Sequence, residues 1–166
     1  MNRLTLTLFC VAFSSLCFSC QSPIFDHTNA PAVGAKDPLS LSAASADCAL
    51  SFSKSELCAS LSWDSPPVEG QDSPFTLRFW NSKTSSKNGP YVDPSLTVFT
   101  KLWMPAMGHG SSPITTVHTK DPAGGDVTGI YHSTDVFFIM GGDWEVHVQL
   151  KQGQTVVEEA ILPISI

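Results

Sequence analysis

The sequence predicts an all-β fold, an immunoglobulin-like antiparallel β-sandwich of seven or eight strands. Three observations favour it. From Asp47 to Ile166, apolar and polar residues alternate over short runs, as they do in half-buried strands. Clusters of Gly, Pro, Asp and Asn separate these runs, and no segment carries a helical apolar period of useful length. A chain of this length can bury a single core. A β-barrel is the alternative architecture.

The expected strands follow from the alternation. The clearest one places Trp144, Val146 and Val148 on an inward face, with Glu145 and His147 facing outward. Breaks such as Asp64-Ser65-Pro66-Pro67 end the runs. The strands are expected at residues 57–63, 75–80, 96–103, 114–119, 127–140, 144–150 and 156–166.

The run from Val127 to Met140 allows two interpretations. As one long strand, it leads into Gly141-Gly142, which then forms a two-residue hairpin turn. Alternatively, two strands are broken at Ser133-Thr134-Asp135. We favour the single strand because of the favourable Gly-Gly turn.

The N-terminus resembles an export signal. A basic start, Asn2-Arg3, precedes the apolar run Leu4–Phe18, which suits a secretory signal and is too short for a stable membrane anchor. The sequence Phe18-Ser19-Cys20 resembles the lipobox of bacterial lipoproteins, although Cys17 stands where an aliphatic residue is usual. We expect a lipoprotein-type signal peptide over residues 1–19 and lipidation of Cys20; a plain signal peptide is the alternative.

Residues 20–46 are predicted to be a flexible tether. They are rich in Pro, Ala, Ser and Asn and show little periodicity, so they cannot bury enough surface to offset the entropy of ordering. Residues 47–166 then form the folded domain. The chain is expected to be exported to the periplasm or cell envelope and held at the membrane by lipid on Cys20.

The cysteine count supports an oxidising location. Of five cysteines, Cys10 and Cys17 lie in the predicted signal and Cys20 is the lipidation site. Cys48 and Cys58 remain as an even pair and are expected to form a local disulfide. Two buried free thiols are the alternative.

The charge excludes some partners. The predicted mature chain keeps all 15 acidic residues and loses Arg3 from the 9 Lys and Arg, so its net charge is about −7. No basic cluster occurs, which makes nucleic acid and anionic headgroups poor partners and cations plausible ones.

The segment Met104–Pro113 is the candidate functional loop. It follows the strand run Leu96–Trp103 and places Met104, Met107 and His109 within six residues, between glycines and prolines. Thioether sulfur and imidazole suit Cu(I), so the loop predicts a copper site. The alternative is structural: packing of the two methionines and a solvated turn histidine.

The topology adds a conditional fourth ligand. If Val127–Met140 is one strand, Met140 reaches the same end of the sandwich as the loop.

The remaining histidines, His27, His118, His132 and His147, are less favoured as ligands. No nucleophile elbow, His-Glu-x-x-His helix or phosphate-binding glycine loop occurs, so we expect no catalysis.

A family resemblance rests on several motifs in order. Trp103–Gly110 resembles the Met-Pro-x-Met-x-His stretch of YtkA-like domains, relatives of the FixH family. Gly129–Tyr131, Phe138–Trp144 and Val146–Val148 resemble that family's later motifs, so the likeness covers about Phe75–Leu150. The resemblance implies an immunoglobulin-like cell-envelope domain linked to metal handling, often copper supply to respiratory oxidases.

Together these observations predict an exported, lipid-anchored and non-catalytic β-sandwich that binds copper or a similar soft cation. It would exchange the metal with a donor or acceptor protein in the envelope. The alternative is an interaction module whose Met/Trp-rich loop end contacts a partner protein.

Overall fold

The computed structural model describes residues 47–166. The expected signal peptide, the lipidation at Cys20 and the tether lie outside these described residues. Within residues 47–166, no helix is long and apolar enough to cross a membrane.

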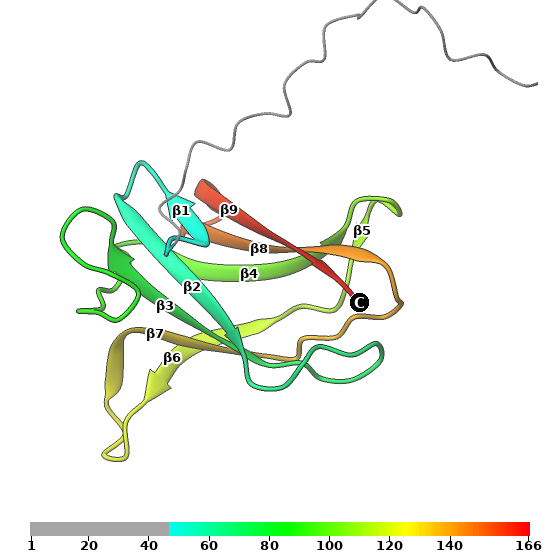
Figure 1. Cartoon of the computed structure of the whole chain (residues 1–166), viewed down its shortest axis with the longest axis horizontal. Helices are drawn as coiled ribbons and strands as arrows, with labels where there is room; N and C mark the ends of the chain where they lie inside the picture. Colours follow the sequence, from blue (N-terminus) through cyan, green and yellow to red (C-terminus); the bar gives the residue numbers. More distant parts are fainter. Residues whose placement is uncertain (1–46) are drawn as a thin grey trace, which may run out of the picture. The chain divides into compact units, whose positions relative to one another are not determined.

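The described residues form two antiparallel sheets, which confirms the predicted β-sandwich (Figure 1). One sheet has the strand order β1-β2-β3-β7-β6 and the other the order β5-β4-β8-β9. Residues 47–166 contain nine strands rather than seven or eight; the additional strands β1 and β5 are only three and two residues long. The strands are β1 Leu50–Phe52, β2 Leu57–Trp63, β3 Phe75–Asn81, β4 Thr97–Met104, β5 His109–Gly110, β6 Thr115–Lys120, β7 Asp126–Thr134, β8 Asp143–Gln152 and β9 Thr155–Ser165.

The sandwich has two ends that matter for function. The Met/His end is where β2 and β4 finish and where β3, β6 and β8 begin; it lies on the right of Figure 1, beside β5. The opposite end is where β4 begins and where β6 passes into β7. The β4 strand therefore connects the two ends.

Alternating residues from both sheets build one core. Phe75, Leu77 and Phe79 on β3 are fully buried, as the alternation predicted, and so are Trp144 and Val146 on β8. Their polar neighbours along each strand face outward, which is why a period of two was readable in the sequence.

A chain of hydroxyl groups crosses the core between the sheets. The Thr100 Oγ1 on β4 lies 2.6 Å from Thr116 Oγ1 on β6, which in turn lies 3.0 Å from Ser133 Oγ on β7. Thr100 and Ser133 are fully buried, so each needs such a partner.

At the opposite end, Glu158 ties the two sheets together. This buried β9 side chain accepts hydrogen bonds from the Lys54 N–H at 2.6 Å, the Ser55 N–H at 3.1 Å and the Ser55 hydroxyl at 2.8 Å. It thereby fixes the β1–β2 turn against the other sheet.

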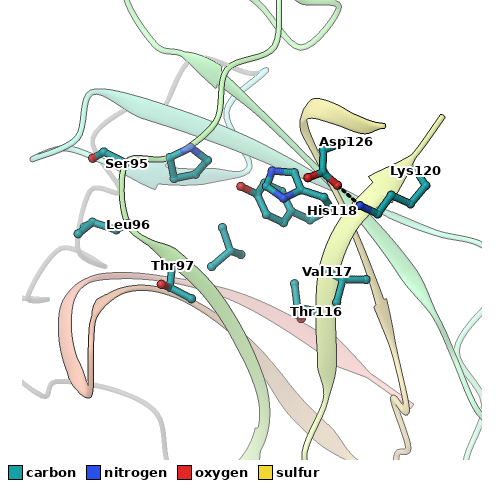
Figure 2. A pocket seen from close by; sticks show the side chains of 11 residues that line it. Ser95, Leu96, Thr97, Thr116, Val117, His118, Lys120 and Asp126 are labelled. Atoms are coloured by element: carbon teal, nitrogen blue, oxygen red, sulfur yellow. Dashed lines mark hydrogen bonds and ion pairs between the residues drawn. The ribbon is translucent and has the colours of Figure 1, made fainter. Parts of the chain in front are cut away.

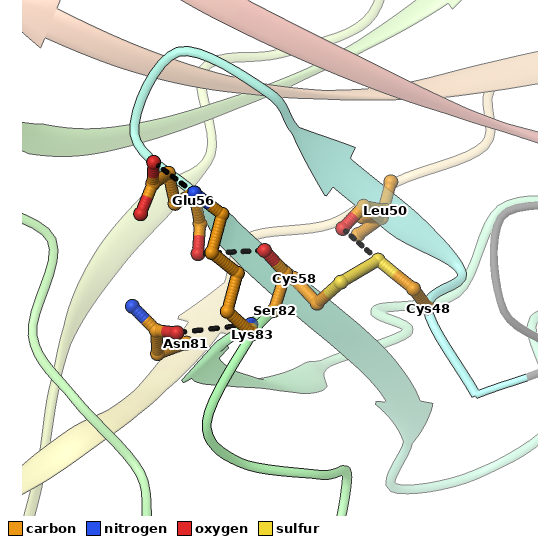
Figure 3. The surroundings of a disulfide bond; sticks show 7 residues. All are labelled: Cys48, Leu50, Glu56, Cys58, Asn81, Ser82 and Lys83. Atoms are coloured by element: carbon orange, nitrogen blue, oxygen red, sulfur yellow. Dashed lines mark hydrogen bonds and ion pairs between the residues drawn. A yellow bond between two sulfur atoms is a disulfide. The ribbon is translucent and has the colours of Figure 1, made fainter.

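The predicted disulfide is present (Figure 3). Cys48 and Cys58 are bonded, with 5.3 Å between their Cα atoms. Both are buried in a small cluster with Trp80 and Tyr91 on the outer face of the five-stranded sheet. The bond holds the start of the domain to β2.

The favoured interpretation of Val127–Met140 is wrong. The β7 strand ends at Thr134, and Asp135 has a positive φ of 63°. The chain then leaves its sheet and crosses the core, where Val136 and Phe138 are fully buried, before it starts β8 in the other sheet. Gly141-Gly142 is therefore no hairpin turn, because β7 and β8 do not pair.

Candidate functional site

The β4–β5 hairpin carries three of the four predicted ligands. The β-register pairs Met104 with His109, and the N–H groups of Met107 and Gly108 donate to the Met104 carbonyl at 3.2 and 3.0 Å. Gly108 has a φ of +67°, which favours glycine. A Cβ on Gly110 would lie 2.7 Å from the Leu102 carbonyl oxygen. The two glycines thus allow the tight hairpin that brings His109 back beside Met104.

Met104 and His109 share one face of this hairpin. Residues directly opposite each other in an antiparallel pair project to the same side, with Cβ atoms about 5 Å apart. Met104 is 4% exposed and packs in the core, whereas His109 is half-buried. A thioether and an imidazole are therefore neighbours at the rim of the core.

The hydrogen bond of His109 fixes its tautomer. Its Nδ1 lies 3.0 Å from the Gly110 carbonyl oxygen, which can only accept. Nδ1 must then carry a proton, and in the neutral ring Nε2 keeps the lone pair. An Nδ1–H bonded to a backbone carbonyl is the usual arrangement around a histidine that binds metal through Nε2.

Met140 reaches the same end, although by the irregular crossing rather than along a strand. The Trp144 indole N–H donates to its carbonyl at 2.9 Å, and its partly buried side chain packs against the core cluster that contains Met104. The Met104 Cε lies 3.1 Å from where a Cβ on Gly142 would be. The missing side chain at Gly142, with its φ of +129°, leaves room for the Met104 methyl group.

Met107 differs from the other two methionines. It lies in the hairpin loop and is 57% exposed. The described fold therefore sets Met104 beside His109, packs Met140 against the core cluster to which Met104 belongs, and leaves Met107 exposed in the loop.

The other potential ligands do not gather. Within residues 47–166, no group of three or more His, Cys, Asp or Glu side chains is arranged to hold a metal ion.

A groove of about 590 Å³ lies at the opposite end (Figure 2). The run Pro94–Val98 forms one wall and β6 the other. His118 on β6 and Tyr131 on β7 also line it, and their ring centroids are 4.1 Å apart. Lys120 and Asp126 form an ion pair of 2.5 Å at its edge.

The polar groups beside this groove bind one another. Asp93 Oδ1 accepts from the Gly129 N–H at 2.6 Å and lies 3.0 Å from His118 Nε2. Burial pushes the pKa of Asp93 upward, but these hydrogen bonds outweigh it and hold that pKa below its ordinary value. Burial and the Asp93 charge raise the pKa of Tyr131 to about 12. Asp93 thus fixes its loop to β7, which is a structural role.

The sequence did not single out Asp93, because nothing in a polar loop marks one carboxylate as a cross-link. The only local signal was Gly129. With a φ of +68°, it passes so close to the preceding loop that a Cβ would lie 2.6 Å from the Val92 nitrogen.

A second internal network involves His147 on the outward face of β8. Its ring nitrogens lie 2.8 Å from Glu159 Oε1 and 2.9 Å from Glu145 Oε2, and the residue is only 8% exposed. Burial raises the pKa of Glu159, but hydrogen bonds from Gln149 and His147 outweigh this and lower it overall. Both ring nitrogens thus face carboxylate oxygens of the protein itself.

Comparison with known proteins gives no relative: no family model, curated protein or solved structure matches this chain.

Proposed function

We propose that this chain binds Cu(I) or a similar soft cation at the Met/His end, without catalysis, through Met104, Met107 and His109. Met140 is the possible fourth ligand. The proposal includes export, a lipid anchor on Cys20 and metal exchange with another envelope protein, in line with the resemblance to YtkA-like domains.

The observation that carries the proposal is the geometry of His109. Its Nδ1 is held by a backbone carbonyl, which leaves the Nε2 lone pair available, and the β-register sets it opposite the Met104 thioether. Imidazole and thioether are donors that Cu(I) accepts, and both survive in an oxidising compartment where free thiolates are lost.

The two remaining thioethers extend this pair. Met140 packs in the cluster that contains Met104, and Met107 follows three residues after Met104 in the same loop. Because Met107 is 57% exposed, it can turn toward an ion without any loss of core packing. A three-donor site would need the Met107 side chain to turn toward Met104 and His109.

A Cu(I) competition titration against a chromophoric chelator tests this proposal. The triple variant Met104→Leu, Met107→Leu and His109→Asn removes the donors at nearly constant volume, and we expect it to lose Cu(I) binding. The matched control, His118→Asn with His132→Asn, removes imidazoles from other places and should bind as the parent does. Equal affinity in the parent and the triple variant would contradict the proposal.

A further inference from the structure

Three exposed apolar side chains lie in loops at the Met/His end. Val68, Met107 and Ile139 are 44, 57 and 48% exposed. They come from three different loops, and two hydrogen bonds link neighbouring segments at this end. The Gly70 N–H donates to the Phe138 carbonyl at 2.8 Å, and the Ser111 hydroxyl donates to the Phe137 carbonyl. We call Val68, Met107 and Ile139 the apolar rim.

Among the described residues, acidic side chains occur at both ends, but the lysines are concentrated at the opposite end. Within residues 47–166, the loops and strand ends at the Met/His end contain no Lys or Arg, whereas five of the six lysines lie at the opposite end. The acidic residues of the Met/His end are Asp64, Glu69, Asp72, Asp135 and Asp143, and the lysines of the opposite end are Lys54, Lys83, Lys87, Lys120 and Lys151.

Ion pairing makes the two ends still less alike. At the opposite end, three lysines are neutralised by carboxylates, in the pairs Lys83–Glu56, Lys87–Asp47 and Lys120–Asp126. At the Met/His end, carboxylates bind backbone, hydroxyl or imidazole groups. Examples are Asp72 with the Val136 N–H, Asp143 with the Ser165 hydroxyl and Asp64 with the His132 ring. The negative charge there is therefore not cancelled by Lys or Arg.

We propose that the Met/His end is the docking face for a partner protein whose contact surface is basic around an apolar centre. The apolar rim would fill that centre, and the surrounding carboxylates would select a cationic surface and speed its approach. The proposal rests on the proposed function for its purpose, since Met107 belongs both to the ligand set and to the rim. A metal donor or acceptor docked here would meet the metal directly.

Charge also decides among the possible occupants. A second copy of this chain would bring two acidic ends together, which like-charge repulsion opposes. An anionic lipid surface or a nucleic acid would be repelled for the same reason. The basic protein surface is the occupant that both the apolar rim and the carboxylates favour.

A labelled synthetic peptide of alternating Lys and Leu serves as the probe, with a Glu/Leu peptide of equal length as its control. Fluorescence anisotropy with the metal-free full chain measures binding at low and at physiological salt. We expect the Lys/Leu peptide to bind in a salt-sensitive way and the Glu/Leu peptide not to bind. Salt-insensitive binding of both peptides would overturn the proposal.

Charge-matched variants localise the interaction. Glu69→Gln with Asp135→Asn removes two charges at the Met/His end, and Asp47→Asn with Asp126→Asn removes two at the opposite end. We expect the first pair to weaken binding of the Lys/Leu peptide about tenfold and the second to leave it nearly unchanged. Equal weakening by the two pairs would refute a docking face at the Met/His end.

Apolar variants test the rim in the same way. The double variant Val68→Ser with Ile139→Ser should weaken binding of the Lys/Leu peptide. The control Val117→Ser with Val156→Ser should not, because these valines are 55 and 42% exposed but lie outside the Met/His end. Parental affinity in the rim variant would contradict the proposal, and so would sedimentation that shows the parent as a dimer and the rim variant as a monomer.

None of these substituted residues is a proposed metal ligand, so the two proposals fail separately. Loss of peptide binding in the charge and rim variants with unchanged Cu(I) affinity supports docking. Localised peptide binding by a parent that binds no Cu(I) would overturn the metal proposal alone.

Discussion

The contrast between Met104 and Met107 yields the sharpest prediction about the candidate site. Met104 is 4% exposed and belongs to the core cluster, whereas Met107 is 57% exposed in the hairpin loop. Truncation of a buried methionine to alanine loses its transfer free energy and leaves a cavity, which costs about 2–5 kcal/mol. Because the Met104 methyl group lies at the rim against Gly142, partial collapse is possible, so we expect about 3 kcal/mol.

The same truncation at Met107 should change the free energy of unfolding by no more than about 0.5 kcal/mol, because its side chain faces solvent. Urea unfolding followed by tryptophan fluorescence measures both values, and Met104→Leu, which keeps the volume, should cost less than about 1.5 kcal/mol. Losses of similar size for Met104→Ala and Met107→Ala would refute the assignment of one buried and one exposed thioether.

Three further predictions concern contacts elsewhere in the fold. Glu158→Ala leaves the N–H groups of the β1–β2 turn without their acceptor, so the free energy of unfolding should fall by about 2–4 kcal/mol. Glu158→Gln keeps an acceptor oxygen and should restore part of this loss. If urea unfolding shows a loss below about 0.5 kcal/mol for Glu158→Ala, Glu158 does not tie the two sheets together. Gly129→Ala places a Cβ 2.6 Å from the Val92 nitrogen at a positive φ, so it should lower the free energy of unfolding by more than about 2 kcal/mol. A small change in urea unfolding would show that the loop before β4 is held only loosely against β7. With Tyr91→Phe, the remaining tyrosine is Tyr131, and its absorbance should titrate near pH 12. A raised pKa favours the neutral phenol in the fold, so its contribution to stability is complete below about pH 10 and is lost as the pH rises toward 12. Titration near pH 10 in the folded protein would contradict the burial of this phenol.

Much of the fold was predictable because half-buried strands alternate with a period of two. The β2 strand occupies the expected residues 57–63, and the expected inward face of β8, from Trp144 to Leu150, is buried. Turn residues such as Asp64-Ser65-Pro66-Pro67 marked the breaks between strands. These are local signals, which a sequence carries by itself.

The crossing after β7 could not be read from alternation. Buried residues alternate up to Ser133, and the pattern resumes at Val136 and Phe138 with its phase shifted by one position. A single residue with positive φ, Asp135, absorbs that shift while the chain changes sheets. Because each half alternates, the sequence resembles one long strand.

The candidate site was only partly predictable for a similar reason. The residue types of the Met/His loop and its position at a strand end were visible in the sequence. The pairing of Met104 with His109 and the hydrogen bond at Nδ1 depend on the hairpin register. The clamp of His147 needs Glu159 from β9 as well as Glu145 on its own strand. Contacts that depend on strand register cannot be read from the residue types alone.

The central claim is that thioether and imidazole groups of the Met/His end hold a soft cation. X-ray absorption at the copper edge of the Cu(I)-loaded chain tests it most directly, because sulfur and nitrogen neighbours scatter differently. We expect both sulfur and imidazole neighbours in the parent, loss of sulfur in the variant with Met104→Leu and Met107→Leu, and loss of the imidazole signal in His109→Asn. A spectrum with only nitrogen and oxygen neighbours, or one unchanged by these substitutions, would contradict the claim.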